Sequence, residues 1–371
     1  MPTNVLLTSA GRRNYLVEYF RTALGGRGEV YAADATAEAP ALQESDRAFV
    51  VPPVFDERYI DCLIELCRTH GVRLLISLND LELPILAAQR ERFGAIGTIP
   101  VVSSPDVIDA CLDKLSTLDV LRRSGLEGPK SYVSLDGARD ALRRREVTFP
   151  LVVKPRWGTA SIAIEYPEDD EELELAYRSV QRRLPKTILA NVSGANPAGA
   201  VLVQERLQGQ ECGLDVINDL NGRYVTTFAR VKLAMRAGET DRAVTVKSGE
   251  LERLGRALGT QLGHVGNLDC DVFLRDGRGY VLEINPRFGG GYPFSHSAGA
   301  NLPAALLAWA DGEMPDSSWL QIEPDVAAAK CDRLVIVAKH RKSGSLLQAV
   351  PGPGGNEGAR VCRLLQPVVR P

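Results

Sequence analysis

The chain has 371 residues, a length that accommodates two or three domains with substantial cores. Its 44% hydrophobic and 25% charged residues are typical of a globular protein, and its formal net charge of −3 does not favour nucleic-acid binding. The N-terminus lacks the pattern of a signal peptide, and no apolar run approaches the roughly 20 residues of a membrane span. We therefore expect a cytoplasmic protein that binds neither nucleic acid nor membrane.

The first 105 residues alternate between short apolar runs and segments with helical spacing. Strands are expected at 4–8, 29–34 and 74–78, and helices at 15–24, 56–70 and 81–91. This alternation predicts a parallel, doubly wound sheet. The turn after the first strand holds a single glycine, Gly11, so the GxGxxG fingerprint is absent and a dinucleotide oxidoreductase is disfavoured. Polar residues follow these strands, where such sheets bind ligands: Ser9, Asp34, Asn79, Asp80 and Glu82.

The remainder of the chain mixes helices with hairpins. Helices are expected at 106–124, 168–184, 248–262 and 300–311, and strands at 149–154, 201–204, 211–218, 224–231 and 333–338. Small residues follow the strand at 149–154, forming a loop at 158–161. The segments 187–200 and 234–242 are expected to be a loose connection and a polar loop. The two halves of the chain therefore differ in kind, parallel α/β first and mixed hairpins later.

The stretch LDCDVFLRDGRGYVLEINPRFGGG, residues 268–291, is the most informative. Two apolar runs flank Asp276–Gly279, which has the composition of a hairpin turn. A hairpin brings Asp271 to the same end as Glu283 and Asn285, which are two apart and face one side of a sheet. Their oxygen atoms suit Mg²⁺, and Arg287 on the same side could hold a phosphate.

Other motifs precede this hairpin in a fixed order. They are Asp113-Lys114, Lys154-Pro155, the small-residue loop at 158–161, and Gln204–Leu207 followed by Glu211. With the acidic hairpin, this order resembles the ATP-grasp superfamily, particularly single-module members akin to the domains of the carbamoyl-phosphate synthase large subunit. The resemblance extends over about residues 1–312. It implies an α/β (α+β) fold with a Rossmann-like pre-ATP-grasp domain at 1–105. The lobes of the ATP-grasp domain would span 106–190 and 191–312, with an extension at 313–371.

The resemblance also implies a nucleotide site with ATP and Mg²⁺, or Mn²⁺, as cofactors. Lys114 and Lys154 would contact the phosphates, and Gly158 and Ser161 would offer an anion nest. Further nucleotide contacts would come from the hinge and two later strands: Gln204, Glu205, Leu207, Glu211, Lys232 and Arg236. Asp271, Glu283 and Asn285 would bind the metal. Arg287, Lys154 and Glu283 would act at the reacting phosphoryl group.

The function implied is an ADP-forming carboxylate–amine ligase that works through an acyl phosphate, acting on an amino acid or small peptide. Its partners would be a small-molecule carboxylate and an amine, and a homodimer is a possible assembly. Two alternatives are kept. One is an enzyme that phosphorylates bicarbonate, like carbamoyl-phosphate synthase or biotin carboxylase. The other is a catalytically idle, ATP-binding regulatory protein.

Overall fold

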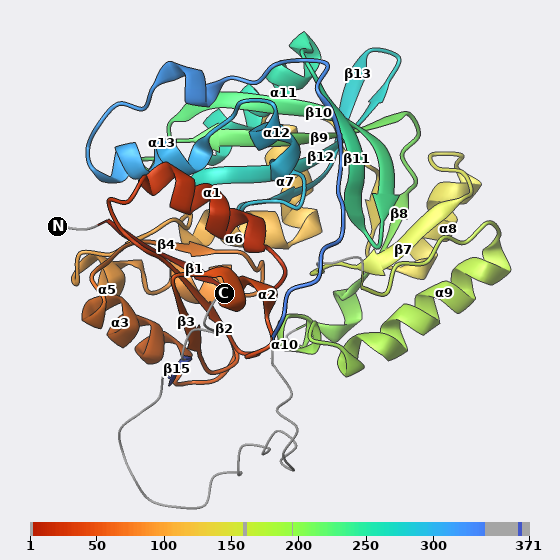
Figure 1. Ribbon diagram of the computed structural model, residues 1–371. Helices are drawn as coiled ribbons and strands as arrows, with labels where there is room; N and C mark the ends of the chain where they lie inside the picture. The colour runs from red at the N-terminus through yellow and green to blue at the C-terminus, as the bar shows by residue number, and fades with distance from the viewer. Residues whose placement is uncertain (1–2, 159–161, 195, 338–362, 366–371) are drawn as a thin grey trace, which may run out of the picture. The chain divides into compact units, whose positions relative to one another are not determined.

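The computed structural model describes residues 3–158, 162–194, 196–337 and 363–365 (Figure 1). The chain forms two compact units, one of Met1–Pro100 with Cys331–Pro371 and one of Val101–Lys330. The four-part division expected from the sequence stays a prediction. None of the described helices is long and apolar enough to span a membrane.

The first unit is built on a six-stranded sheet in the order β15-β3-β2-β1-β4-β5. Its strands are β1 (Asn4–Thr8), β2 (Val30–Asp34), β3 (Arg47–Val50), β4 (Val72–Ser77), β5 (Ile99–Pro100) and β15 (Arg363–Leu365). Its helices are α1 (Asn14–Leu24), α2 (Pro40–Glu44), α3 (Tyr59–Thr69), α4 (Leu83–Ala87) and α5 (Arg90–Gly94). β1 to β5 pair in parallel and β15 is antiparallel. Every residue of the central strand β1 is buried, and its middle, Val5–Leu7, is apolar, as expected of a parallel strand covered on both faces.

The second unit begins with a three-stranded antiparallel sheet, in the order β6-β8-β7. These strands are β6 (Ser131–Tyr132), β7 (Leu151–Pro155) and β8 (Val201–Glu205). The helices of this part are α6 (Pro105–Leu112), α7 (Lys114–Arg123), α8 (Leu135–Arg143), α9 (Asp170–Arg183) and α10 (Ala190–Ser193), with short 3-10 helices at Leu184–Lys186 and Pro197–Gly199. α9 has three acidic residues in its first turn and two arginines in its last, which complements the helix dipole.

The larger sheet of this unit has the order β13-β12-β9-β10-β11-β14 and is antiparallel. Its strands are β9 (Gln210–Asn218), β10 (Tyr224–Arg236), β11 (Glu239–Val246), β12 (Gly266–Arg275), β13 (Arg278–Asn285) and β14 (Ala327–Ala329). The helices are α11 (Gly249–Leu262), α12 (Tyr292–Ser297) and α13 (Leu302–Ala310), with a 3-10 helix at Ser317–Leu320. The expected hairpin is confirmed, but its turn is shorter than the expected Asp276–Gly279: only Asp276 and Gly277 lie between the strands, and both have positive φ.

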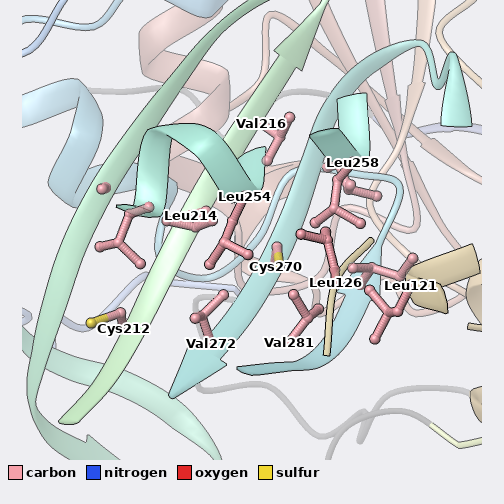
Figure 2. Close-up of a cluster of buried hydrophobic side chains, with 14 of the residues drawn as sticks. Leu121, Leu126, Cys212, Leu214, Val216, Leu254, Leu258, Cys270, Val272 and Val281 are labelled. Atoms are coloured by element: carbon pink, nitrogen blue, oxygen red, sulfur yellow. The ribbon is translucent and has the colours of Figure 1, made fainter. Parts of the chain in front are cut away.

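One face of this larger sheet contributes to a hydrophobic core of the unit. α11 packs against β9 and β10, and Leu254 and Leu258 of α11 point toward the strands (Figure 2). Alternate strand residues enter the core: Cys212, Leu214 and Val216 from β9, and Leu268, Cys270 and Val272 from β12. The residues between them therefore face the opposite side of the sheet.

Several sequence expectations about local structure were wrong. The helix expected at 106–124 is two helices separated at Asp113, whose backbone is extended and whose side chain caps α7. The loop expected at 234–242 is the end of a β-hairpin that turns at Ala237 and Gly238, because cross-strand pairing holds this polar segment in extended form. The helix expected at 81–91 is split into α4 and α5. The connection expected at 187–200 contains short helices, and residues 333–337 carry no strand.

A buried histidine predicts acid sensitivity of the fold. His264 is fully buried with Nε2 3.0 Å from the Val216 carbonyl oxygen, and burial lowers its pKa to about 4. The folded state keeps His264 neutral while the unfolded chain takes up a proton near pH 6.5, so this contribution to stability is lost as the pH falls from 6.5 toward 4.

We expect His264 to cost roughly 2 to 3 kcal/mol of unfolding free energy between pH 7 and pH 4.5. Urea unfolding of the wild type and of His264→Gln at both pH values measures this cost. The difference between the two proteins isolates His264 from other titrating groups. An equal loss of stability in both proteins would show that His264 is not the cause.

Candidate active site

The β12–β13 hairpin brings the predicted metal ligands together. Asp271 lies directly opposite Glu283, and Asp269 lies opposite Asn285. The register shifts just beyond this pair, because Val272 is opposite Val281, so Leu282 is an extra residue. This β-bulge reverses the side to which the strand presents its side chains. Val281 therefore enters the core, whereas Glu283 and Asn285 share the polar face with Asp271.

Lys232 of β10 joins two carboxylates on this polar face. Its Nζ lies 2.8 Å from Glu211 Oε1 on β9 and 2.7 Å from Asp271 Oδ1 on β12. The Lys232 side chain is only 4% exposed. Burial would lower its pKa, but the charges of Asp271 and Glu211 outweigh burial and raise it. Lys232 is therefore a fixed positive charge between the two acids.

Lys114, the first residue of α7, contacts the third carboxylate of this group, Glu283. Its Nζ donates to the Gly158 carbonyl oxygen at 2.8 Å and lies 3.2 Å from Glu283 Oε1. The preceding residue, Asp113, accepts two hydrogen bonds from the Arg156 guanidinium, at 2.6 and 2.5 Å. Burial would raise the pKa of Asp113, but the hydrogen bonds from Arg156, the Leu115 backbone N–H and Ser116 together outweigh burial and lower the pKa. This ion pair ties the start of α7 to the segment after β7.

Lys154 is the third buried cation of the group. It lies on β7 with 5% of its surface exposed. Burial, together with the nearby charge of Lys114, lowers the pKa of Lys154 to about 8, although Glu283 and Asp271 act in the opposite direction. Lys154 is therefore mostly charged at neutral pH but loses its proton within a mildly alkaline range.

These residues fit a magnesium–nucleotide site by their chemistry. Asp271 and Glu283 are paired carboxylates on adjacent strands, and three lysines surround them. Mg²⁺ typically takes one or two carboxylates and completes its coordination with water and phosphate oxygens. Among the described residues, no three His, Cys, Asp or Glu side chains gather closely enough to hold a metal ion by themselves. The arrangement therefore fits a metal that arrives with phosphate groups.

Arg287 sits in a second buried network beside the hairpin. Its Nη1 lies 3.5 Å from Asp269 Oδ2 and donates to the Phe288 carbonyl oxygen at 3.1 Å. Asp269 also receives Arg230 Nη2 at 3.3 Å, and Arg230 Nη1 lies 2.6 Å from Asp215 Oδ2. Burial and the nearby charge of Asp271 raise the pKa of Asp269 to about 6, against the effect of the two arginines.

The other expected nucleotide residues are distributed around these groups. Gln204 donates to Ser131 Oγ at 2.8 Å, and Glu205 N donates to the Lys130 carbonyl oxygen at 2.8 Å. Leu207 is buried just after β8. Arg236 lies at the end of β10, where it is half exposed and pairs with Asp241 at 2.8 Å. Gly158 accepts from Lys114 as described above, whereas Ser161 lies outside the described residues.

The polar residues of the first unit are engaged within that unit. Glu82 is completely buried and accepts hydrogen bonds from Ser9 Oγ, Ser77 Oγ and the Tyr59 hydroxyl at 2.6 to 2.8 Å. Burial raises the pKa of Glu82, while these hydroxyl groups act in the opposite direction. Asp34 accepts from the backbone N–H of Gly11 at 2.9 Å. Both acids therefore hold the loops at the carboxyl ends of the parallel strands.

Sequence reasoning missed three charged residues of the second unit. Asp269 contacts the expected site residue Arg287, Arg230 contacts Asp269, and Arg156 contacts Asp113, which precedes Lys114. A signal was present for two of them, because Asp269 and Arg230 lie two positions before Asp271 and Lys232 on their strands and so share their face. Nothing local to Arg156 indicated its contact with Asp113.

Two family models match separate parts of the chain. A family model described as the PylC-like N-terminal domain matches residues 5–102. A second model, described as ATP-grasp in the biosynthetic pathway with Ter operon, matches residues 198–334. The chain contains an ATP-grasp domain. The resemblance inferred from the sequence is thereby confirmed, and ATP and Mg²⁺ are the cofactors of this family.

Sequence relatives and solved structures similar to this chain are consistent with the presence of an ATP-grasp domain. The carbamoyl phosphate synthase large chain of Mesorhizobium japonicum is 27% identical over 218 residues, 53% of this chain and 18% of that one. A biotin carboxylase–β,γ-ATP complex from Campylobacter jejuni has a TM-score of 0.67 at 16% identity, covering 86% of this chain and 73% of that one. The L-amino acid ligase from Bacillus licheniformis has a TM-score of 0.64 at 20% identity, covering 87% and 79%.

These likenesses confirm the expected fold class, a parallel α/β domain followed by an ATP-grasp domain. At 16% and 20% identity, the solved structures show the fold alone. The chain spans about a fifth of the length of the curated relatives it matches, 18% and 24%.

Proposed function

We propose that this protein is an ADP-forming carboxylate–amine ligase that works through an acyl phosphate. The observation that carries the proposal is that Lys114 and Lys232 contact three carboxylates at 2.7 to 3.2 Å, while Lys154 lies close enough for the charges of Glu283 and Asp271 to act on its pKa. Closely packed opposite charges suit a site in which the carboxylates bind Mg²⁺ and the lysines bind phosphate when the nucleotide arrives. The members of this group are Lys114, Lys154, Lys232, Glu211, Asp271 and Glu283.

Each residue then has a defined part in binding and positioning. Asp271, Glu283 and Asn285 would hold Mg²⁺, which neutralises phosphate charge when bound. Lys154 and Lys114 would bind phosphate oxygens, and Gly158 and Ser161 are proposed to offer an anion nest to the same phosphates. Glu211, Lys232, Gln204, Glu205, Leu207 and Arg236 are proposed to hold the rest of the nucleotide. Arg287 would contact the γ-phosphoryl group. In this proposal, most of the rate acceleration comes from positioning the reactants and neutralising phosphate charge.

The reaction proceeds in two steps. An oxygen of the substrate carboxylate attacks the γ-phosphorus of ATP, and ADP leaves. The amine then attacks the acyl carbon, inorganic phosphate leaves with that carboxylate oxygen, and the amine releases a proton. We propose an amino acid or small peptide as the carboxylate. The second candidate substrate is bicarbonate, favoured by the match to carbamoyl phosphate synthase large chains.

The products distinguish this proposal from its alternatives. We expect ADP and phosphate from Mg-ATP with pooled amino acids, dipeptides or bicarbonate as acceptors, and oxygen-18 from a labelled carboxylate in the phosphate. Mg-ATP alone should raise the melting temperature, because it binds only the folded state, whereas NAD should not. Stoichiometric AMP and pyrophosphate would contradict the acyl-phosphate route. Binding of Mg-ATP without turnover on any acceptor would favour the idle regulatory protein.

The proposal also covers the oligomeric state of the protein and its cellular compartment. We propose that the protein works in the cytoplasm, where ATP is supplied, on small molecules and without nucleic acid. A homodimer is the assembly to be tested, by light scattering at several protein concentrations. A monomer at all concentrations would contradict it.

A further inference from the structure

Arg230 is a buried guanidinium that joins two carboxylates on the polar face of the large sheet. Its side chain is 1% exposed, and Nη1 lies 2.6 Å from Asp215 Oδ2. Nη2 lies 3.3 Å from Asp269 Oδ1. Asp215 also accepts hydrogen bonds from Ser295 Oγ at 2.6 Å and from Asn267 Nδ2 at 3.1 Å. Arg230 is therefore held at one end by a fully satisfied, buried acid.

The other end of Arg230 leads to Arg287. Asp269 Oδ1 accepts from Arg230, and Asp269 Oδ2 lies 3.5 Å from Arg287 Nη1. Asn267 Nδ2 lies 3.4 Å from the Arg287 carbonyl oxygen, so the same network also contacts the Arg287 backbone. A continuous set of contacts thus runs from Asp215 through Arg230 and Asp269 to Arg287.

The glycines that follow Arg287 show that the chain is built around this network. A Cβ atom on Gly291 would lie 2.0 Å from Arg230 Nη2, and one on Gly289 would lie 2.1 Å from Asp269. On β9, a Cβ on Gly213 would lie 2.9 Å from the same guanidinium. A side chain at any of these positions would displace the Arg230 guanidinium or the Asp269 carboxylate, and glycine avoids this. The loop after Arg287 therefore packs directly against the ion pair of Arg230 and Asp269.

We infer that Arg230 is a positioning residue that acts through Asp269 to hold Arg287 toward the γ-phosphoryl group. This inference rests on the proposed function, in which Arg287 contacts that group. A guanidinium reaches two carboxylates at once because its N–H groups fork from a rigid plane, which a lysine ammonium cannot reproduce. Without the Arg230 guanidinium, Asp269 loses the contact that fixes its side chain, and Arg287 then loses its fixed orientation. Arg230 does not itself contact the nucleotide.

Binding of Mg-ATP and Mg-ADP by isothermal calorimetry tests the inference without requiring turnover. The two ligands differ in the γ-phosphoryl group, so the ratio of their dissociation constants reports the contact made by Arg287. Arg287→Ala should reduce the preference for ATP about tenfold, as expected for one charge-assisted hydrogen bond. Arg230→Lys should reduce it by a similar factor while leaving the affinity for Mg-ADP unchanged. Asp269→Asn is a second variant should Arg230→Lys fold poorly.

The double variant Arg230→Lys/Arg287→Ala separates positioning from general damage. Because Arg230 acts through Arg287, the double variant should match Arg287→Ala in its ATP preference. Arg253→Lys is the control, since Arg253 pairs with Glu250 at 2.8 Å on the exposed side of α11. Equal weakening of both nucleotides by Arg230→Lys, or additive effects in the double variant, would overturn the inference.

The experiment also separates this inference from the proposed function. If Arg287→Ala reduces the ATP preference and neither Arg230→Lys nor Asp269→Asn does, only the positioning role is overturned. If Arg287→Ala leaves the preference unchanged, the proposed role of Arg287 at the γ-phosphoryl group is wrong, and the inference fails with it.

Discussion

Replacing Glu283 with glutamine is expected to reduce ADP release at least about 100-fold while leaving the protein folded. The substitution keeps the shape of the side chain but removes a negative charge from the pair formed with Asp271. Glutamine is a poor ligand for Mg²⁺, so the metal and its phosphate oxygens lose their anchor on β13. Lys114 would keep its hydrogen bond to the Gly158 carbonyl oxygen, so its ammonium group retains one partner in the variant.

Turnover assays and circular dichroism on the same preparations check this expectation. Glu252→Gln is the matched control, because Glu252 lies exposed on α11 in the same unit and carries the same charge. The control should release ADP like the wild type. A well-folded Glu283→Gln variant with wild-type ADP release would remove Glu283 from the metal site.

Replacing Lys154 with methionine is expected to weaken Mg-ATP binding about 100-fold, the loss typical of a buried charge-assisted contact to phosphate. Methionine fills nearly the same volume, and Lys154 is only 5% exposed, so the substitution removes a charge from β7 without leaving a cavity. The folded protein should be at least as stable as the wild type, because a buried, desolvated ammonium is no longer required. Calorimetric titration with Mg-ATP measures the affinity, and Lys247→Met, on an exposed lysine, is the control.

Lys154 also predicts how ATP affinity depends on pH. Its pKa of about 8 means that the free protein loses the charge of Lys154 as the pH rises through that value. The wild type should therefore bind Mg-ATP progressively more weakly from pH 7.5 to about 9.5, and Lys154→Met should lack this decline. The same decline in both proteins would assign the titration to another group.

The sequence predicted much of the polar sheet face because strand periodicity is a local property. Glu283 and Asn285 are two positions apart, and the Asp276–Gly277 dipeptide favours the turn that pairs them with the first run. The order of the motifs was sufficient to identify the ATP-grasp domain. Residue roles carried over from that resemblance stay predictions.

Other features could not be predicted because they depend on contacts between distant segments. The break at Asp113 forms where Arg156 binds its carboxylate, and a helical pattern through residues 106–124 gives no sign of that partner. The polar segment at 234–242 extends β10 and β11 because the two strands pair with each other, despite its loop-like composition.

The sequence by itself determined the two kinds of sheet and the acidic hairpin with its turn after Arg275. Only the tertiary structure decided the bulge at Leu282, the bridging position of Lys232 and the buried pair of Arg230 and Asp215. Periodicity fixes which face of a strand a residue occupies. The partner on that face is set by sheet register and packing, and a buried charge is stable only where those long-range contacts supply its counter-charge.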